Sequence, residues 1–181
     1  KDETDKLEEY LHSNKVIVMQ TAPAVRVSLG EEFNMKPGAN VEGKMITALR
    51  TIGADYVFDT TFGADLTVME EASELVNRIK TNKNLPMFTS CCPSWVKFCE
   101  IFYPEYLDNL STCKSPISMM GSVINNYFCK INNLKREDII SIVIVPCTSK
   151  KMEILRYNDI DLAITTRELA KYLKKEKINL A

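Results

Sequence analysis

The chain has 181 residues, of which 45% are hydrophobic and 26% charged, and its formal net charge is −1. This is the composition of an ordinary globular domain with one core, and so balanced a charge gives no electrostatic basis for a nucleic-acid or membrane-surface partner. No apolar run reaches the roughly 18 residues of a membrane-spanning helix, and the charged opening segment KDETDKLEEYL is unlike a signal peptide.

Five apolar runs of strand length follow one another along the chain. They are KVIVMQ (15–20), DYVFDTT (55–61), PMFTSC (86–91), SIVIVPC (141–147) and IDLAITT (160–166). Because each run is continuous rather than alternating, it is typical of a strand in a parallel sheet that is covered on both faces.

The segments between these runs have helical apolar spacing. We expect one helix over 41–53 that ends at Gly53 and another over 64–82 with Asp65 as N-cap. Thr165 and Glu168 form a candidate capping box for a helix near the end of the chain. Strands that alternate with helices predict an α/β fold with a mainly parallel sheet flanked by helices.

The cysteines and the single histidine limit the chemistry. With no secretion signal and enough core residues, we expect thiols that are free or bound to metal in a reducing compartment. Cys99, Cys113 and Cys129 lie in apolar helix-like segments and are interpreted as small buried hydrophobes. Since His12 is the only histidine, neither a His-based zinc site nor a Ser-His triad is expected. The remaining cysteines are Cys91, Cys92 and Cys147.

Four unusual stretches are expected at one edge of the sheet, where parallel strands end and ligands bind. They are APAVR (22–26), FDTTFGADL, TSCCP and PCTSKKMEI (146–154). Cys92 precedes a proline-started helix, and helix N-termini favour an anionic sulfur. Cys92 and Cys147 therefore indicate an iron–sulfur or other soft-metal site. Two thiolates do not complete a four-cysteine cluster, so either further ligands come from elsewhere or the site is not a cluster.

Taken singly, these residues have ordinary explanations. Lys150 alone is typical of a surface lysine, and Glu70, Glu71 and Glu74 are typical of a solvated acidic face. The methionines are expected to fill the core. The adjacent thiols of Cys91 and Cys92 alone are a weak indication of chemistry, so the stretches have to be weighed together.

Taken together, six stretches resemble the catalytic H-domain of the FeFe-hydrogenases. In order they are QTAPAVRVSLGEEF, VFDTTFGADLTVMEEASEL, PMFTSCCPSWVKFCE, LSTCKSP, VPCTSKKMEI and DIDLAITTRELA. The resemblance implies the first lobe of a two-lobed domain that reversibly reduces protons to H2 with electrons from ferredoxin or a similar carrier. It implies an H-cluster, which is a 4Fe-4S cubane joined to a diiron subcluster with CO, cyanide and azadithiolate. Hydrogenase maturation proteins are implied as partners, and the cytoplasm or a hydrogenosome-like anaerobic organelle as the location.

The resemblance also implies roles for individual residues. Cys92 and Cys147 match two ligands of the cubane, and Cys91 matches the thiol that relays protons to the bridging amine. The resemblance thus implies that Cys92 of the adjacent pair binds the redox-active cluster, whereas Cys91 transfers protons. The family's proton path continues through positions that match Glu71, Glu74 and Ser111. Glu71 and Glu74 are one helical turn apart, so they share a helix face.

Four further positions match the family's diiron pocket. Lys150 matches the lysine that hydrogen-bonds a cyanide, for which an ammonium is a suitable donor. Pro23 and Ala24 match the loop around the other cyanide, which contributes backbone donors. Pro116 matches a proline that lines the pocket.

The sequence departs from the family pattern in three places. Val145 replaces the usual methionine, Ser94 replaces the usual glycine, and the third cysteine motif is absent. We therefore expect residues 15–181 to be a partial H-domain, whose missing C-terminal lobe follows in the same chain or is a separate one. Residues 1–14 are expected to be a linker or an N-terminal helix.

Two alternatives stay open. A related iron–sulfur assembly protein shares the cubane site without the diiron site, and the pair Cys91 and Lys150 argues against it. An inactive, metal-free half-domain is the second alternative.

Overall fold

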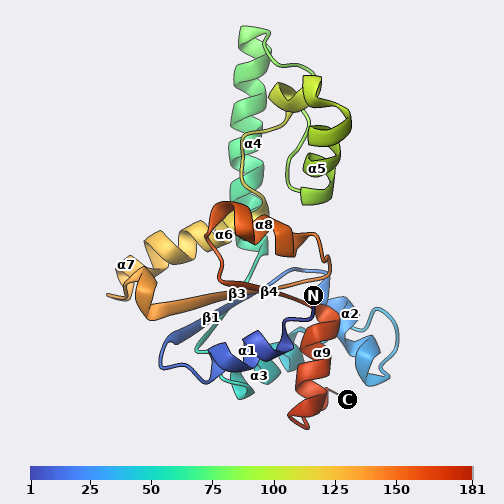
Figure 1. The fold of residues 1–181 in the computed structure, drawn as a ribbon, viewed down its shortest axis with the longest axis vertical. Coiled ribbons are helices and arrows are strands. Elements are labelled where there is room, and N and C mark those ends of the chain that lie inside the picture. Colours follow the sequence, from blue (N-terminus) through green and yellow to red (C-terminus); the bar gives the residue numbers. More distant parts are fainter. Residues whose placement is uncertain (181) are drawn as a thin grey trace.

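The computed structural model describes residues 1–180; Ala181, the last residue of the predicted domain, lies outside them. Four strands form one parallel sheet in the order β2-β1-β3-β4 (Figure 1). Their bounds are β1 Val16–Thr21, β2 Tyr56–Asp59, β3 Ile139–Val145 and β4 Leu162–Thr165. The predicted α/β fold with a parallel sheet between helices is confirmed.

Helices cover both faces of this sheet (Figure 1). The α-helices are α1 Thr4–Leu11, α2 Val25–Ser28, α3 Glu42–Thr51, α4 Thr61–Thr81, α5 Pro93–Phe102, α6 Pro116–Val123, α7 Cys129–Ile131, α8 Lys150–Tyr157 and α9 Thr166–Lys175. Short 3-10 turns cover Leu29–Phe33, Pro104–Asn109 and Arg136–Asp138, and a π-helical turn over Ile124–Phe128 joins α6 to α7. Among the described residues, no helix is long and apolar enough to cross a membrane.

The continuous apolar runs are explained by hydrophobic cores on both faces of the sheet. Ile142 and Ile144 of β3 pack into the larger core with side chains of α1, α3 and α9, whereas Val143 and Val145 pack on the opposite face against Ile117 of α6. Since successive side chains of a strand point to opposite faces, a strand buried on both sides needs an apolar residue at nearly every position.

The predicted strand over 86–91 is wrong. Within this segment Phe88 forms only an isolated bridge, with Leu110. The cause is α4, which has 21 residues and therefore runs about 30 Å. It carries the following segment away from the sheet, into a helical projection that is formed by α4, α5 and the residues between α5 and α6 (Figure 1). TSCCP therefore belongs to this helical projection and not to the end of a strand.

The helix ends follow the predictions in part. Asp65 is not an N-cap, because α4 already begins at Thr61, whose backbone N–H donates to Asp59 Oδ1 over 2.9 Å. The capping box is confirmed: Glu168 N–H donates to Thr165 Oγ1 over 3.2 Å, and Thr165 N–H to Glu168 Oε2 over 2.7 Å. Gly53 follows α3 in a left-handed conformation with φ 115°, which glycine adopts without strain.

Gly63 lies where α4 crosses α6, and we expect Gly63→Ala to lower the free energy of unfolding by about 3 kcal/mol. An added Cβ would lie 2.3 Å from the Pro116 carbonyl oxygen, and a backbone atom cannot rotate away. Urea unfolding measures the effect. Gly43→Ala is the control, since Gly43 is an exposed position in α3 with no atom within 4 Å of the added Cβ. A Gly63→Ala protein as stable as the parent would contradict the prediction.

Candidate functional site

The carboxyl edge of the sheet carries three of the four unusual stretches. Pro23 and Ala24 follow β1, Asp59 ends β2, and Cys147 follows β3 by two residues. Pro23, Ala24 and Cys147 are exposed. Arg26 donates to Asp59 Oδ2 over 2.6 Å, and this ion pair ties the segment after β1 to the end of β2. Although partial burial raises it, hydrogen bonds from Thr61 and Arg26 hold the pKa of Asp59 below its ordinary value.

The fourth stretch, TSCCP, reaches this edge by a different route. Cys92 is the N-cap residue of α5, and Pro93 is its first helical residue, where proline is favoured. Lys150, the first residue of α8, donates from Nζ to the Cys91 carbonyl oxygen over 2.7 Å. The structure thus brings the two cysteine motifs together although one of them lies on the helical projection.

A second contact joins these two motifs at the departure from the family pattern. The hydroxyls of Ser94 and Ser149 are 2.5 Å apart. Both residues lie beside the cysteines, at the start of α5 and just before α8. Ser94, at the position where the resemblance leads us to expect glycine, therefore adds a direct contact between TSCCP and PCTSK.

Lys150 is not an ordinary surface lysine, because its side chain is only 16% exposed. Its Nζ also pairs with Glu153 Oε2 over 2.6 Å. Glu153 is buried and its Oε1 accepts hydrogen bonds from two serines of the α6 region, Ser118 over 2.9 Å and Ser115 at close range. The lysine ammonium is therefore fixed between the Cys91 carbonyl and the start of α6.

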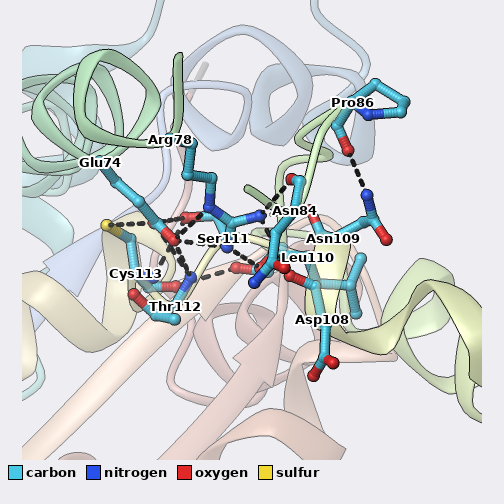
Figure 2. A network of polar contacts seen from close by, with 11 residues as sticks. Glu74, Arg78, Asn84, Pro86, Asp108, Asn109, Leu110, Ser111, Thr112 and Cys113 are labelled. Carbon is cyan, nitrogen blue, oxygen red and sulfur yellow. Dashed lines mark hydrogen bonds and ion pairs between the residues drawn. The ribbon is translucent and has the colours of Figure 1, made fainter. Parts of the chain in front are cut away.

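Glu74 is the centre of a polar network on the helical projection (Figure 2). Its Oε2 accepts from Ser111 Oγ over 2.8 Å and its Oε1 pairs with Arg78 Nη2 over 2.6 Å. The Thr112 N–H also donates to Oε2, over 3.1 Å. Partial burial raises the pKa of Glu74, but hydrogen bonds from Ser111 and Arg78 outweigh it and keep this pKa below its ordinary value. Glu74 and Ser111, both predicted site residues, are thus directly bonded.

Glu71 lies one turn before Glu74 and differs from it in hydrogen bonding. Its Oε1 is buried and has no hydrogen-bond partner within residues 1–180, which is rare in folded proteins. The thiol of Cys113, in the loop before α6, is 3.8 Å from Glu74 Oε2, and burial, reinforced by both glutamates, raises the pKa of this thiol. Cys113 is therefore a loop residue of the polar network, and the prediction that it is a buried helical hydrophobe is wrong. Cys99 and Cys129 are buried as predicted.

Pro116 begins α6, and its position is set by β1. Gln20 is fully buried and donates from Nε2 to the Ile117 carbonyl over 3.1 Å, while Thr60 donates to Gln20 Oε1 over 3.0 Å. One side chain of the central strand thus holds the starts of α6 and α4 in register. The role of Gln20 could not be predicted from the sequence, because a polar residue inside an apolar run gives no indication of its partner.

Glu153 and Arg78 were also missed. Their spacing was the available signal: Lys150 and Glu153 are three residues apart, and Glu74 and Arg78 four apart, in helices. Such pairs are common on exposed helix faces, so spacing alone does not show burial.

The donor set fits part of an iron–sulfur site. Cys91, Cys92 and Cys147 are exposed, so their thiols are accessible to a metal group. Yet no cluster of three or more ligating side chains that could hold a metal ion occurs in the part of the chain that the structure describes. A four-thiolate cubane site needs two ligands more than Cys92 and Cys147 can supply.

Comparisons with known proteins identify the family of the chain. Residues 15–181 match the family described as iron only hydrogenase large subunit, C-terminal domain. The chain is 47% identical to iron hydrogenase 1 of Clostridium pasteurianum over 100% of this chain and 33% of that protein. It is 42% identical to the periplasmic Fe hydrogenase large subunit of Nitratidesulfovibrio vulgaris, over 97% of this chain and 44% of that protein.

A second kind of relative is more distant. The cytosolic Fe-S cluster assembly factor narfl of Xenopus tropicalis is 32% identical over 93% of this chain and 38% of its own length. The chain therefore spans between a third and a half of these relatives.

Solved structures show the same fold. An FeFe-hydrogenase from Chlamydomonas reinhardtii superposes with a TM-score of 0.94 at 36% identity, over 99% of this chain and 49% of that one. The fold, the two cysteine motifs and the matched family agree. The chain belongs to the family of iron-only hydrogenase large subunits.

Proposed function

We propose that this chain supplies the first part of an FeFe-hydrogenase H-domain and that the assembled protein reversibly reduces protons to H2. The observation that carries the proposal is the 2.7 Å contact from Lys150 Nζ to the Cys91 carbonyl oxygen. It gathers a fixed ammonium, a thiol free to exchange protons and the neighbouring ligand thiol of Cys92 at one place.

Each residue then has a separate task at an H-cluster. When bound, that group supplies the redox-active iron for cleaving or forming the H–H bond. Cys92 and Cys147 ligate the cubane, and Cys91 exchanges a proton through its thiol. Lys150 would donate to a cyanide, and the backbone N–H of Ala24 would donate to the other cyanide, whereas Pro23 has no N–H and would only shape the loop. Pro116 would line the pocket.

Proton movement away from Cys91 uses the polar groups on the helical projection. We propose that Glu71, Ser111 and Glu74 continue the path toward solvent. The hydrogen bond between Ser111 and Glu74 and the unpaired buried Oε1 of Glu71 support this path. A general acid–base chain of this kind has to keep each group within hydrogen-bond reach of the next.

The remaining ligands and partners lie outside this chain. We propose that a second lobe, in the same polypeptide or in a separate chain, supplies the other two cysteines. We further propose a ferredoxin or similar carrier as the electron partner, maturation proteins that insert the diiron unit, and a location in the cytoplasm or an anaerobic organelle. Because one relative is named periplasmic, fractionation of the source cells tests the location.

Infrared spectroscopy of the complete, anaerobically matured protein tests the function. We expect cyanide and carbonyl stretching bands together with H2 evolution from a reduced electron carrier. A protein with a cubane but without these bands would be an assembly factor, in line with the more distant relatives. A folded protein that binds no iron would be an inactive domain.

Cys147→Ala is expected to remove most of the cubane iron from the complete protein. The change deletes one of four thiolate ligands, and cluster binding depends on the full set. Iron and acid-labile sulfide per chain measure the loss. Cys129→Ala is the matched control, because the Cys129 thiol is buried under α6 and the sheet. Full iron content in Cys147→Ala would contradict the ligand assignment.

A further inference from the structure

We infer that Glu153 is the residue that positions Lys150, and that Ser115 and Ser118 hold Glu153 for this purpose. The inference rests on the proposed function only for the ligand that Lys150 contacts. The arrangement of Glu153 around Lys150 stands on the contacts themselves.

Glu153 is a buried carboxylate whose two oxygens have different partners. The residue is 7% exposed. Oε1 accepts from Ser115 and Ser118, and Oε2 pairs with Lys150 Nζ over 2.6 Å. A buried carboxylate is costly unless it is paired and hydrogen-bonded. These contacts satisfy both oxygens, and they fix the carboxylate against rotation.

The contacts join three segments that are far apart in the sequence. Glu153 and Lys150 lie in α8, Ser115 and Ser118 at the start of α6, and Cys91 just before α5. Pro116, which we place in the diiron pocket, lies between the two serines. Glu153 thereby sets the position of the ammonium relative to both the relay thiol's backbone and the pocket wall.

The Lys150 ammonium has one N–H donor beyond those used in the contacts described above. An ammonium has three N–H donors, and the contacts that we describe use two, to the Cys91 carbonyl and to Glu153 Oε2. With two donors fixed, the direction of the third is determined. That third N–H is what the ammonium presents to an anionic ligand.

Amine acylation of the complete protein before insertion of the diiron unit tests the positioning. The probe is acetic anhydride, and mass spectrometry compares the labelling rates of Lys150 and the neighbouring Lys151, which pairs separately with Glu168. In Glu153→Gln we expect the rate of Lys150 relative to Lys151 to rise about tenfold, the size of one lost charge-assisted hydrogen bond. An unchanged ratio overturns the inference.

Two further variants make the result specific. Glu100→Gln removes a different ion pair, the one that joins α5 to Arg156 of α8, and should leave the Lys150 ratio as in the parent; a rise in this variant too overturns the inference. Ser118→Ala keeps the Glu153 charge but removes one of its donors, and should raise the ratio by a smaller factor. If Glu153→Gln does not fold, Ser118→Ala alone decides. An unchanged labelling ratio in Ser118→Ala then overturns the inference.

Infrared spectra of the matured protein give the second readout. The cyanide bands should shift in Glu153→Gln and stay in place in Glu100→Gln. Bands that stay in place while Lys150 labelling rises overturn the positioning role. A parent protein without such bands would refute the proposed function, while the labelling experiment would still decide whether Glu153 holds Lys150.

Discussion

Cys91→Ser is expected to lower the H2 turnover of the complete enzyme by a factor of roughly 10² to 10⁴, the usual contribution of a general acid–base group, with iron content unchanged. A hydroxyl releases a proton far less readily than a thiol, so serine keeps the shape of the loop and loses the proton transfer. The Cys91 backbone remains bonded to Lys150 through its carbonyl, which the substitution does not touch. Turnover per iron and iron content are both measured. A loss of turnover at full iron content indicates that Cys91 relays protons, whereas a loss of iron indicates that it is a cluster ligand.

The matched control for this variant is Cys99→Ser in the same helical region. Cys99 is fully buried, and its thiol faces the Tyr103 carbonyl over 3.4 Å. The same change from sulfur to oxygen there should leave turnover per iron unaltered. If Cys91→Ser turns over H2 at the parental rate, or loses iron as Cys147→Ala does, the division of labour between Cys91 and Cys92 is wrong.

The sheet could be predicted from the sequence because its signal is local. Runs such as 141–147 are apolar at every position after Ser141, and a strand buried on both faces requires nearly continuous apolar residues. The run over 86–91 is apolar only in part, and for a different reason. Phe88 contacts the rings of Trp95 and Tyr106 on the helical projection, so it packs against aromatic side chains there and not in the sheet.

The site could be predicted only where a motif carried it. TSCCP and PCTSK indicated candidate site residues, but not how two segments nearly 60 positions apart are held together. That depends on Glu153, Ser115 and Ser118, whose side chains are individually ordinary. Long-range polar contacts of this kind leave no periodic pattern in the sequence. The residues that hold Lys150 can therefore be identified only from the three-dimensional structure.

Arg78→Met is expected to lower the free energy of unfolding by about 3–5 kcal/mol, the range for a buried pair that loses one partner. Arg78 is 7% exposed. Besides Glu74, its guanidinium donates to a row of loop carbonyls at 2.7–3.2 Å, those of Asn84, Asp108, Asn109 and Leu110 (Figure 2). Methionine keeps much of the volume but leaves Glu74 and these carbonyls without their donor. Urea unfolding measures the loss, and Lys80→Met, an exposed position in the same helix, should change stability by less than about 0.5 kcal/mol.

The pH dependence of this deficit tests its cause. In the parent the pKa of Glu74 lies below its ordinary value of 4.5, so the charged carboxylate contributes stability that is present above that pH and lost as the pH falls through the lowered pKa. Without Arg78 the pKa of Glu74 rises, since burial remains and the main cation is gone. Protonation of Glu74 then removes a buried, unpaired charge from the variant, whereas in the parent it breaks the ion pair with Arg78. The difference in free energy of unfolding between parent and variant should therefore shrink below about pH 4.5. A deficit that stays constant with pH would mean that the carbonyl contacts, and not the Glu74 pair, account for the stabilising effect of Arg78. The same titration bears on the proton path, because Arg78 holds Glu74 in its charged, proton-accepting form next to Ser111.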